Sequence, residues 1–140
     1  MPILNIRIQS SDENITLPKP LLAQKLELVR VTISKNASAG EVYFGALYFD
    51  IDILNGYEVI TNQGTNNLIV PVADTPALQT YQMNQIFNSE DVKQSFNVRT
   101  YRRNLTGDYQ FAEFDKTGVG LGKLIWVDLV FNVSELHDYN

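Results

Sequence analysis

The chain has 140 residues, with 11 basic and 16 acidic side chains, one His and no Cys. This length fits one domain with a single hydrophobic core. The lack of Cys excludes disulfides, thiolate nucleophiles and Cys-based zinc sites, and one His excludes a multi-histidine metal site. The net charge of −5 argues against direct binding to nucleic acid. Since no nucleophile has a recognisable base partner, we expect neither an enzyme nor a bound cofactor.

The start of the chain, MPILNIRI, lacks the basic and apolar segments of a signal peptide. No apolar stretch approaches the length of a membrane-spanning helix, so we expect no membrane span. These features predict a protein made in a cytosol.

Alternation of apolar and polar residues predicts a short strand at residues 3–8. A polar turn follows at residues 10–14, and the two prolines at Pro18 and Pro20 predict an extended, irregular segment. We assign residues 1–24 to an N-terminal arm that carries the first strand, and residues 25–140 to the main domain.

The next strands belong to the main domain. Within residues 25–34 the apolar positions change phase, which predicts a β-bulge or a strand buried on both faces. Residues 41–54 form a long apolar strand with a bend near Gly45. Asn55-Gly56 predicts a tight turn, because both residues tolerate positive φ, and residues 57–60 then return as a strand.

Short strands continue through the second half of the chain. Pro71 suits an edge strand at residues 68–72, and residues 80–87 are ambiguous between helix and strand, with strand favoured by alternation. Three further strands are predicted at residues 96–101, 109–114 and 123–133. Regular short strands without a long helix predict an all-β, eight-stranded antiparallel sandwich.

Asp50 and Asp52 are the first candidate site. They are two residues apart on a predicted strand, so they share one face. Paired carboxylates are suited to a divalent cation or to acid–base chemistry. The alternative is an exposed acidic face on an outer strand.

The second candidate site is the basic cluster of Arg99, Arg102 and Arg103 with Tyr101. An aromatic ring among arginines is suited to stacking a base beside a phosphate. On an acidic chain the alternatives are ion pairs around a turn, or a contact with a neighbouring subunit. We take these four residues as candidates for a subunit interface.

Three stretches carry a resemblance to a known family: residues 47–59 (LYFDIDILNGYEV), residues 96–101 (FNVRTY) with the turn at residues 104–107, and residues 125–131 (IWVDLVF). From about Lys25 onward the chain resembles the small single jelly-roll capsid proteins of double-stranded DNA viruses of the algal virus and virophage type. These viruses have major capsid proteins with a double jelly roll.

The resemblance implies a jelly-roll sandwich and a structural role in the virion, as a penton or minor capsid protein. It implies contacts with other copies of the chain, as a pentamer or alternatively a trimer, and with other capsid proteins, including the major one. The arm would then add a strand to a neighbour, with Ile3, Ile6 and Ile8 as candidate contact residues. On this basis, deletion of residues 1–20 is expected to leave the domain folded and abolish assembly.

A second hypothesis is a carbohydrate-binding β-sandwich, either a lectin or a viral receptor-binding module. It predicts exposed aromatic side chains beside Asp50 and Asp52, and binding that depends on calcium.

Overall fold

The computed structural model describes residues 3–21, 24–36, 45–73, 76–89, 93–104, 106–117 and 122–135. These residues form eleven strands: β1 (Ile3–Ile8), β2 (Asp12–Leu21), β3 (Gln24–Lys35), β4 (Ala46–Ile51), β5 (Val59–Thr61), β6 (Gly64–Asn66), β7 (Leu68–Pro71), β8 (Leu78–Ser89), β9 (Lys93–Arg103), β10 (Tyr109–Phe111) and β11 (Leu124–Glu135). The described residues contain no helix, so none that could cross a membrane. The prediction of an all-β fold is confirmed.

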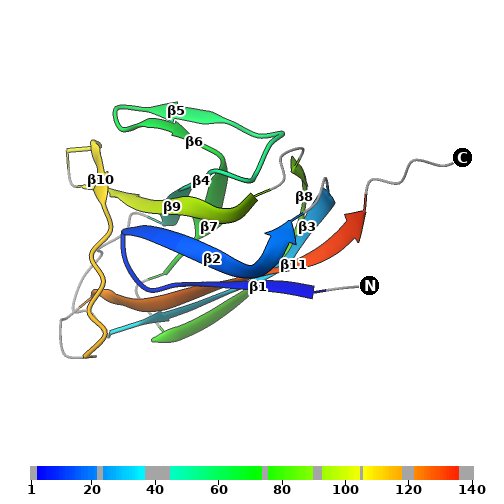
Figure 1. Ribbon diagram of the computed structural model, residues 1–140. Coiled ribbons are helices and arrows are strands. Elements are labelled where there is room, and N and C mark those ends of the chain that lie inside the picture. Colours follow the sequence, from blue (N-terminus) through cyan, green and yellow to red (C-terminus); the bar gives the residue numbers. More distant parts are fainter. Residues whose placement is uncertain are drawn as a thin grey trace, which may run out of the picture.

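Two antiparallel sheets make up most of the molecule (Figure 1). Sheet A has the order β1-β11-β3-β8, and sheet B has the order β10-β9-β4-β7, with β2 also paired to β9. β2 and β10 both pair with β9 on the side opposite to β4, β2 at residues up to Arg99 and β10 from Tyr101 onward. The two strands therefore lie one after the other along that side of β9. A separate hairpin, β5–β6, projects beside sheet B.

One hydrophobic core lies between the two sheets in a sandwich-like arrangement. Side chains alternate along each strand, so every second residue points inward. The buried contributions of sheet A include Ile6, Ile8, Leu28, Val31, Ile33, Phe87, Leu129 and Phe131, and those of sheet B include Leu47, Phe49, Ile51, Leu68, Val70, Phe96 and Val98.

Most of the long strands confirm the sequence predictions. The predicted phase change in residues 25–34 is a register shift at Val29, where β3 passes from one inward-facing set to the other against β11. The ambiguous segment at residues 80–87 is strand, within β8. Pro71 ends β7, which is an edge strand as predicted. Three strands of three residues each, β5, β6 and β10, add to the eight longer ones.

The turn predicted at Asn55-Gly56 does not join two paired strands. Asn55 instead pairs with Asn88 at the end of β8, through two backbone hydrogen bonds of 3.0 Å. The hairpin forms one step later, between β5 and β6, where Thr61 pairs with Gly64. The long strand predicted at residues 41–54 is limited to β4 among the described residues, and residues 41–44 lie outside the described part.

Residues 3–21, expected to form an arm, pair within their own chain. β1 pairs with β11 from Ile3 to Ile8, and β2 pairs with β9. Between Thr16 and Leu21 the register of β2 shifts, so this stretch, with both prolines, leaves the ladder. Prolines are tolerated there because β2 lies at the edge of sheet B, where the missing N–H groups cost no pairing.

Candidate functional site

The outer face of sheet B brings the two predicted clusters together. In the ladder between β4 and β9, Asp50 lies opposite Arg99 and Tyr48 opposite Tyr101. These pairs join segments about fifty residues apart in the sequence. The local pattern of either segment does not predict that the two are neighbours. The combined surface has an ionic half and an aromatic half.

In the ionic half, Arg99 lies between two carboxylates of its own chain. Its Nη1 atom is 3.5 Å from Asp50 Oδ2, and its Nε atom is 3.8 Å from Asp12 Oδ1. The neighbouring Asn97 donates its backbone N–H to Asp52 Oδ2 at 2.9 Å and its side-chain amide to Asp12 Oδ1 at 3.0 Å. The arginine predicted for a subunit contact is therefore part of an ion-pair network within the chain.

The two aspartates differ in their surroundings. Burial raises the pKa of Asp50, and the nearby charge of Asp52 raises it further, while Arg99 lowers it in part. Both carboxylates line a hollow of about 260 Å³ with Glu58 and the half-exposed ring of Tyr57. Among the described residues, no group of three or more His, Cys, Asp or Glu side chains is arranged to hold a metal ion.

In the aromatic half, the rings of β10 pack against those of the neighbouring strands. Tyr109 packs edge-on against Tyr48 with ring centroids 4.7 Å apart, and Phe111 stacks on Tyr101 at 4.9 Å. Tyr48 and Tyr101 are consequently only 9% and 4% exposed, although both point away from the core. Arg103 lies 5.8 Å above the ring of Tyr109.

Burial is the first cause of a raised pKa for both covered tyrosines. The hydrogen bond to Tyr109 raises the pKa of Tyr48 further, and Arg103 opposes this change. Both phenols are therefore protonated and uncharged at neutral pH. This part of the face is suited to packing rather than to acid–base chemistry.

The β5–β6 hairpin is hydrogen-bonded to the backbone of Tyr109 in β10. Asn62 Oδ1 accepts a hydrogen bond from the backbone N–H of Tyr109 at 2.8 Å. The side-chain amides of Asn62 and Gln63 donate to the carbonyl oxygen of Tyr109 at 3.3 and 3.1 Å. At the base of the hairpin, the buried Asn67 bonds to the backbone of Ile51 and Leu54.

The remaining interface candidates do not share one exposed surface. Arg102 alternates to the opposite side of β9 from Tyr101 and is partly buried. Ile6 and Ile8 belong to the core of the chain, because they occupy inward-facing positions of β1. Ile3 alone of the three isoleucines is exposed.

The outer face of sheet A carries a different set of side chains. Arg7 forms two hydrogen bonds to Asp128, at 2.7 and 2.8 Å, and its guanidinium lies 4.2 Å above the ring of Trp126. Three exposed apolar side chains, Ile3, Leu78 and Ile86, lie on the edge strands of the same sheet.

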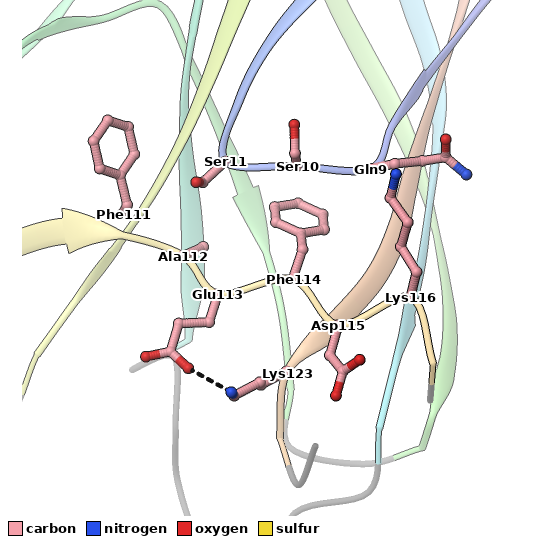
Figure 2. Close-up of a pocket in the computed structure, with 10 residues that line it drawn as sticks. All are labelled: Gln9, Ser10, Ser11, Phe111, Ala112, Glu113, Phe114, Asp115, Lys116 and Lys123. Carbon is pink, nitrogen blue, oxygen red and sulfur yellow. Dashed lines mark ion pairs between the residues drawn. The ribbon is translucent and has the colours of Figure 1, made fainter. Parts of the chain in front are cut away.

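A groove opens at one end of the sandwich, where the sequence predicted only a turn and a strand (Figure 2). One wall is the turn at residues 9–11 between β1 and β2, and the other is the segment 111–116 that follows β10. We call this the end groove; its volume is about 720 Å³, and Lys123, just before β11, completes its lining. The only signal in the sequence is a pair of phenylalanines three residues apart among charged residues, FAEFDK.

Side chains of three kinds line the end groove. Phe114 points between the two walls and packs against the core, while Phe111 at one end is 44% exposed (Figure 2). Glu113 and Lys123 form an ion pair of 3.2 Å on the side of the 111–116 wall that faces away from the turn (Figure 2). Amide and hydroxyl groups come from Gln9 and Ser10.

Comparisons of this chain with protein-family models, with curated proteins and with solved structures found no match.

Proposed function

We propose that this chain is a structural protein of a virion, a penton or minor capsid component that is made in the host cytoplasm. In this proposal it assembles with other copies of itself, as a pentamer, and with other capsid proteins, including a major capsid protein. The observation that carries the proposal is the order of the strands in the two sheets.

The order of the eight longer strands supports the proposal of a jelly roll. Along the chain they change sheets at every step except from β4 to β7, and the resulting orders are β1-β11-β3-β8 in sheet A and β2-β9-β4-β7 in sheet B. Two interleaved Greek keys of eight strands produce this order, and they recur in viral capsid and lectin domains. The strand order thus supports the fold that the sequence resemblance implies.

The outer face of sheet A supports contacts with another subunit. Across the sheet, Ile3 of β1, Asn132 of β11, Glu27 of β3 and Ile86 of β8 fall in one row, because each is paired with the next. Exposed apolar side chains therefore stand at both ends of this row. We propose that a neighbouring subunit covers both of these side chains.

The native mass of the full chain, measured by light scattering with electron microscopy of the same sample, tests the proposal. We expect a closed homo-oligomer, alone or when the chain is co-expressed with a major capsid protein. The variant Ile86→Asp should weaken that assembly, because it places a charge in the contact. The variant Ile60→Asp, on the exposed hairpin strand β5, is the matched control. A chain that stays monomeric at every concentration, even beside the major capsid protein, contradicts the proposal.

The calcium-dependent form of the carbohydrate hypothesis is not supported by the aspartates. Asp50 and Asp52 already accept contacts from Arg99 and Asn97. We therefore expect the same melting temperature in excess calcium and in excess chelator, since an ion that bound the folded state would raise it. A large difference between the two melting temperatures would instead support a metal site at these two residues.

A further inference from the structure

We infer that the end groove binds a short, uncharged saccharide. This activity goes beyond the structural role proposed above and does not depend on it. Four properties of the groove lead to this class of ligand: its paired backbone, its ring surface, its charge balance and its size.

Six backbone groups in the two walls are already hydrogen-bonded. In the turn, the N–H groups of Gln9 and Ser10 donate to Glu13 Oε1, and the carbonyl of Ser11 accepts from Thr100. In the opposite wall, Ala112 N–H, Glu113 C=O and Asp115 N–H are paired with Thr100 and Leu124. An extended peptide that adds a strand needs unpaired backbone groups. Recognition in this groove therefore falls to side chains.

The ring surface is supplied by Phe111. One face of this ring stacks on Tyr101, with an angle of 18° between the planes, and the ring is still 44% exposed. Stacking on a nearly buried tyrosine holds the ring in one orientation, so it loses little freedom when a ligand packs on it. The apolar C–H face of a pyranose ring is a flat partner for such an exposed ring.

The charged side chains of the groove balance. Glu113 and Asp115 are opposed by Lys123 and Lys116, and the first of each forms an ion pair. Of these side chains, Lys116 points toward Gln9 of the turn, while Glu113, Asp115 and Lys123 point away from the turn (Figure 2). The Lys116 ammonium can donate a hydrogen bond to a sugar hydroxyl, and the Gln9 amide can both donate and accept. An acidic or basic ligand would meet no excess of opposite charge.

The size of the groove also fits. A volume of about 720 Å³ lies within the range of small-molecule sites. Figure 2 shows the groove open along its length, with Phe111 at one end and Gln9 and Lys116 at the other. A ligand that packs on Phe111 can thus reach polar groups further along the trough.

Saturation-transfer NMR on the full chain tests this inference, with a panel of uncharged sugars: glucose, galactose, mannose, N-acetylglucosamine, lactose and maltose. We expect at least one sugar to bind with a dissociation constant of about 1 mM, a usual strength for a small ligand on an open site. Binding should be insensitive to salt, since the ligand is uncharged.

The matched variants are Phe111→Leu and Tyr57→Ala. Phe111→Leu keeps an apolar side chain over Tyr101 but removes the ring, so affinity should fall about tenfold while the melting temperature changes little. Tyr57→Ala removes a half-exposed ring outside the groove and should leave binding unchanged. The inference is overturned if no uncharged sugar binds, if Phe111→Leu binds as well as the parent chain, or if short unstructured peptides bind the groove instead. Light scattering on the same samples reports the oligomeric state separately, so failure of either proposal is recognised by itself.

Discussion

The outer faces of the two sheets differ in what covers their apolar side chains. On sheet B, rings from β10 pack against Tyr48 and Tyr101, and the β5–β6 hairpin is hydrogen-bonded to Tyr109 of β10. On sheet A, the described residues leave Ile3, Leu78 and Ile86 exposed by 69%, 59% and 50%. The chain therefore buries the central rings of one outer face by itself and leaves apolar side chains of the other face exposed.

The difference lies in connections rather than in strand composition. Both sheets show the same alternation of inward apolar and outward mixed residues. The segment that connects β4 to β7 carries the hairpin, which lies beside sheet B, and the segment that connects β9 to β11 carries β10, which is part of sheet B. A face covered in this way contributes to the stability of the chain, whereas an uncovered one is available for contacts.

Removal of residues 1–20 is the most drastic test, because it takes an edge strand from each sheet. The deletion removes Ile6, Ile8 and Leu17 from the core, together with the ladder between β1 and β11. We expect no cooperative thermal unfolding of the product in circular dichroism. Ile3→Ser, which changes an exposed side chain of the same strand, should melt like the parent chain. A truncated chain that is folded but unable to assemble would instead support the prediction that these residues form an arm.

Truncation of Tyr101 tests the covered face directly. Tyr101→Ala removes a nearly buried ring and the support of Phe111, so the free energy of unfolding should fall by about 3 kcal/mol. Ile86→Ala on sheet A should change it by less than about 0.5 kcal/mol. Urea denaturation of both variants gives the comparison. Equal losses would mean that the two faces do not differ.

The hairpin is tested at its base and at its tip. The side chain of Asn67 forms three hydrogen bonds to the backbone of Ile51 and Leu54, at 2.6 to 3.1 Å. Asn67→Ala leaves these buried groups without partners and should cost about 2 kcal/mol. Asn62→Ala at the exposed tip should cost about 0.5 kcal/mol. The same urea curves measure both losses, and a larger loss at the tip would contradict this account.

The smallest expected effect is the pH response of Asp50. Its pKa is raised above 3.8 in the folded chain, so the folded state holds this proton more tightly than the unfolded state. The stabilisation from that proton is complete below pH 3.8 and is lost as the pH rises through the folded pKa. Asp50→Asn should therefore melt at a higher temperature than the parent at pH 7, and the advantage should shrink toward pH 3.8.

Thermal melts of Asp50→Asn across this pH range, with Asp108→Asn on an exposed turn as control, measure the effect. A variant that is less stable than the parent at pH 7 would show that the contact with Arg99 outweighs burial.

Local rules predicted the long strands well and failed where an element met a distant partner. The polar residues 10–14 have the composition of a turn, yet Asp12, Glu13 and Asn14 pair with β9 as part of β2. Asn55-Gly56 has the residues of a tight turn, yet the backbone of Asn55 pairs with Asn88. In both places the outcome depended on residues tens of positions away, which no short window contains.

The candidate sites show the same division. The sequence identified Asp50 and Asp52, and separately Arg99 and Tyr101, from their own neighbours. It could not show that these segments are adjacent strands, because cross-strand pairing is set by the whole topology. The end groove escaped prediction for the same reason, since its walls come from opposite ends of the chain.

What the sequence by itself determined is the all-β class, most of the strands and the inward face of each one. These follow from the alternation of apolar and polar residues, which is a local property with a period of two. The tertiary structure alone decided the strand order, the covering of one outer face and the joining of the ionic and aromatic clusters. Those outcomes depend on contacts between residues far apart in the chain, and such contacts form only when both sheets close over a common core.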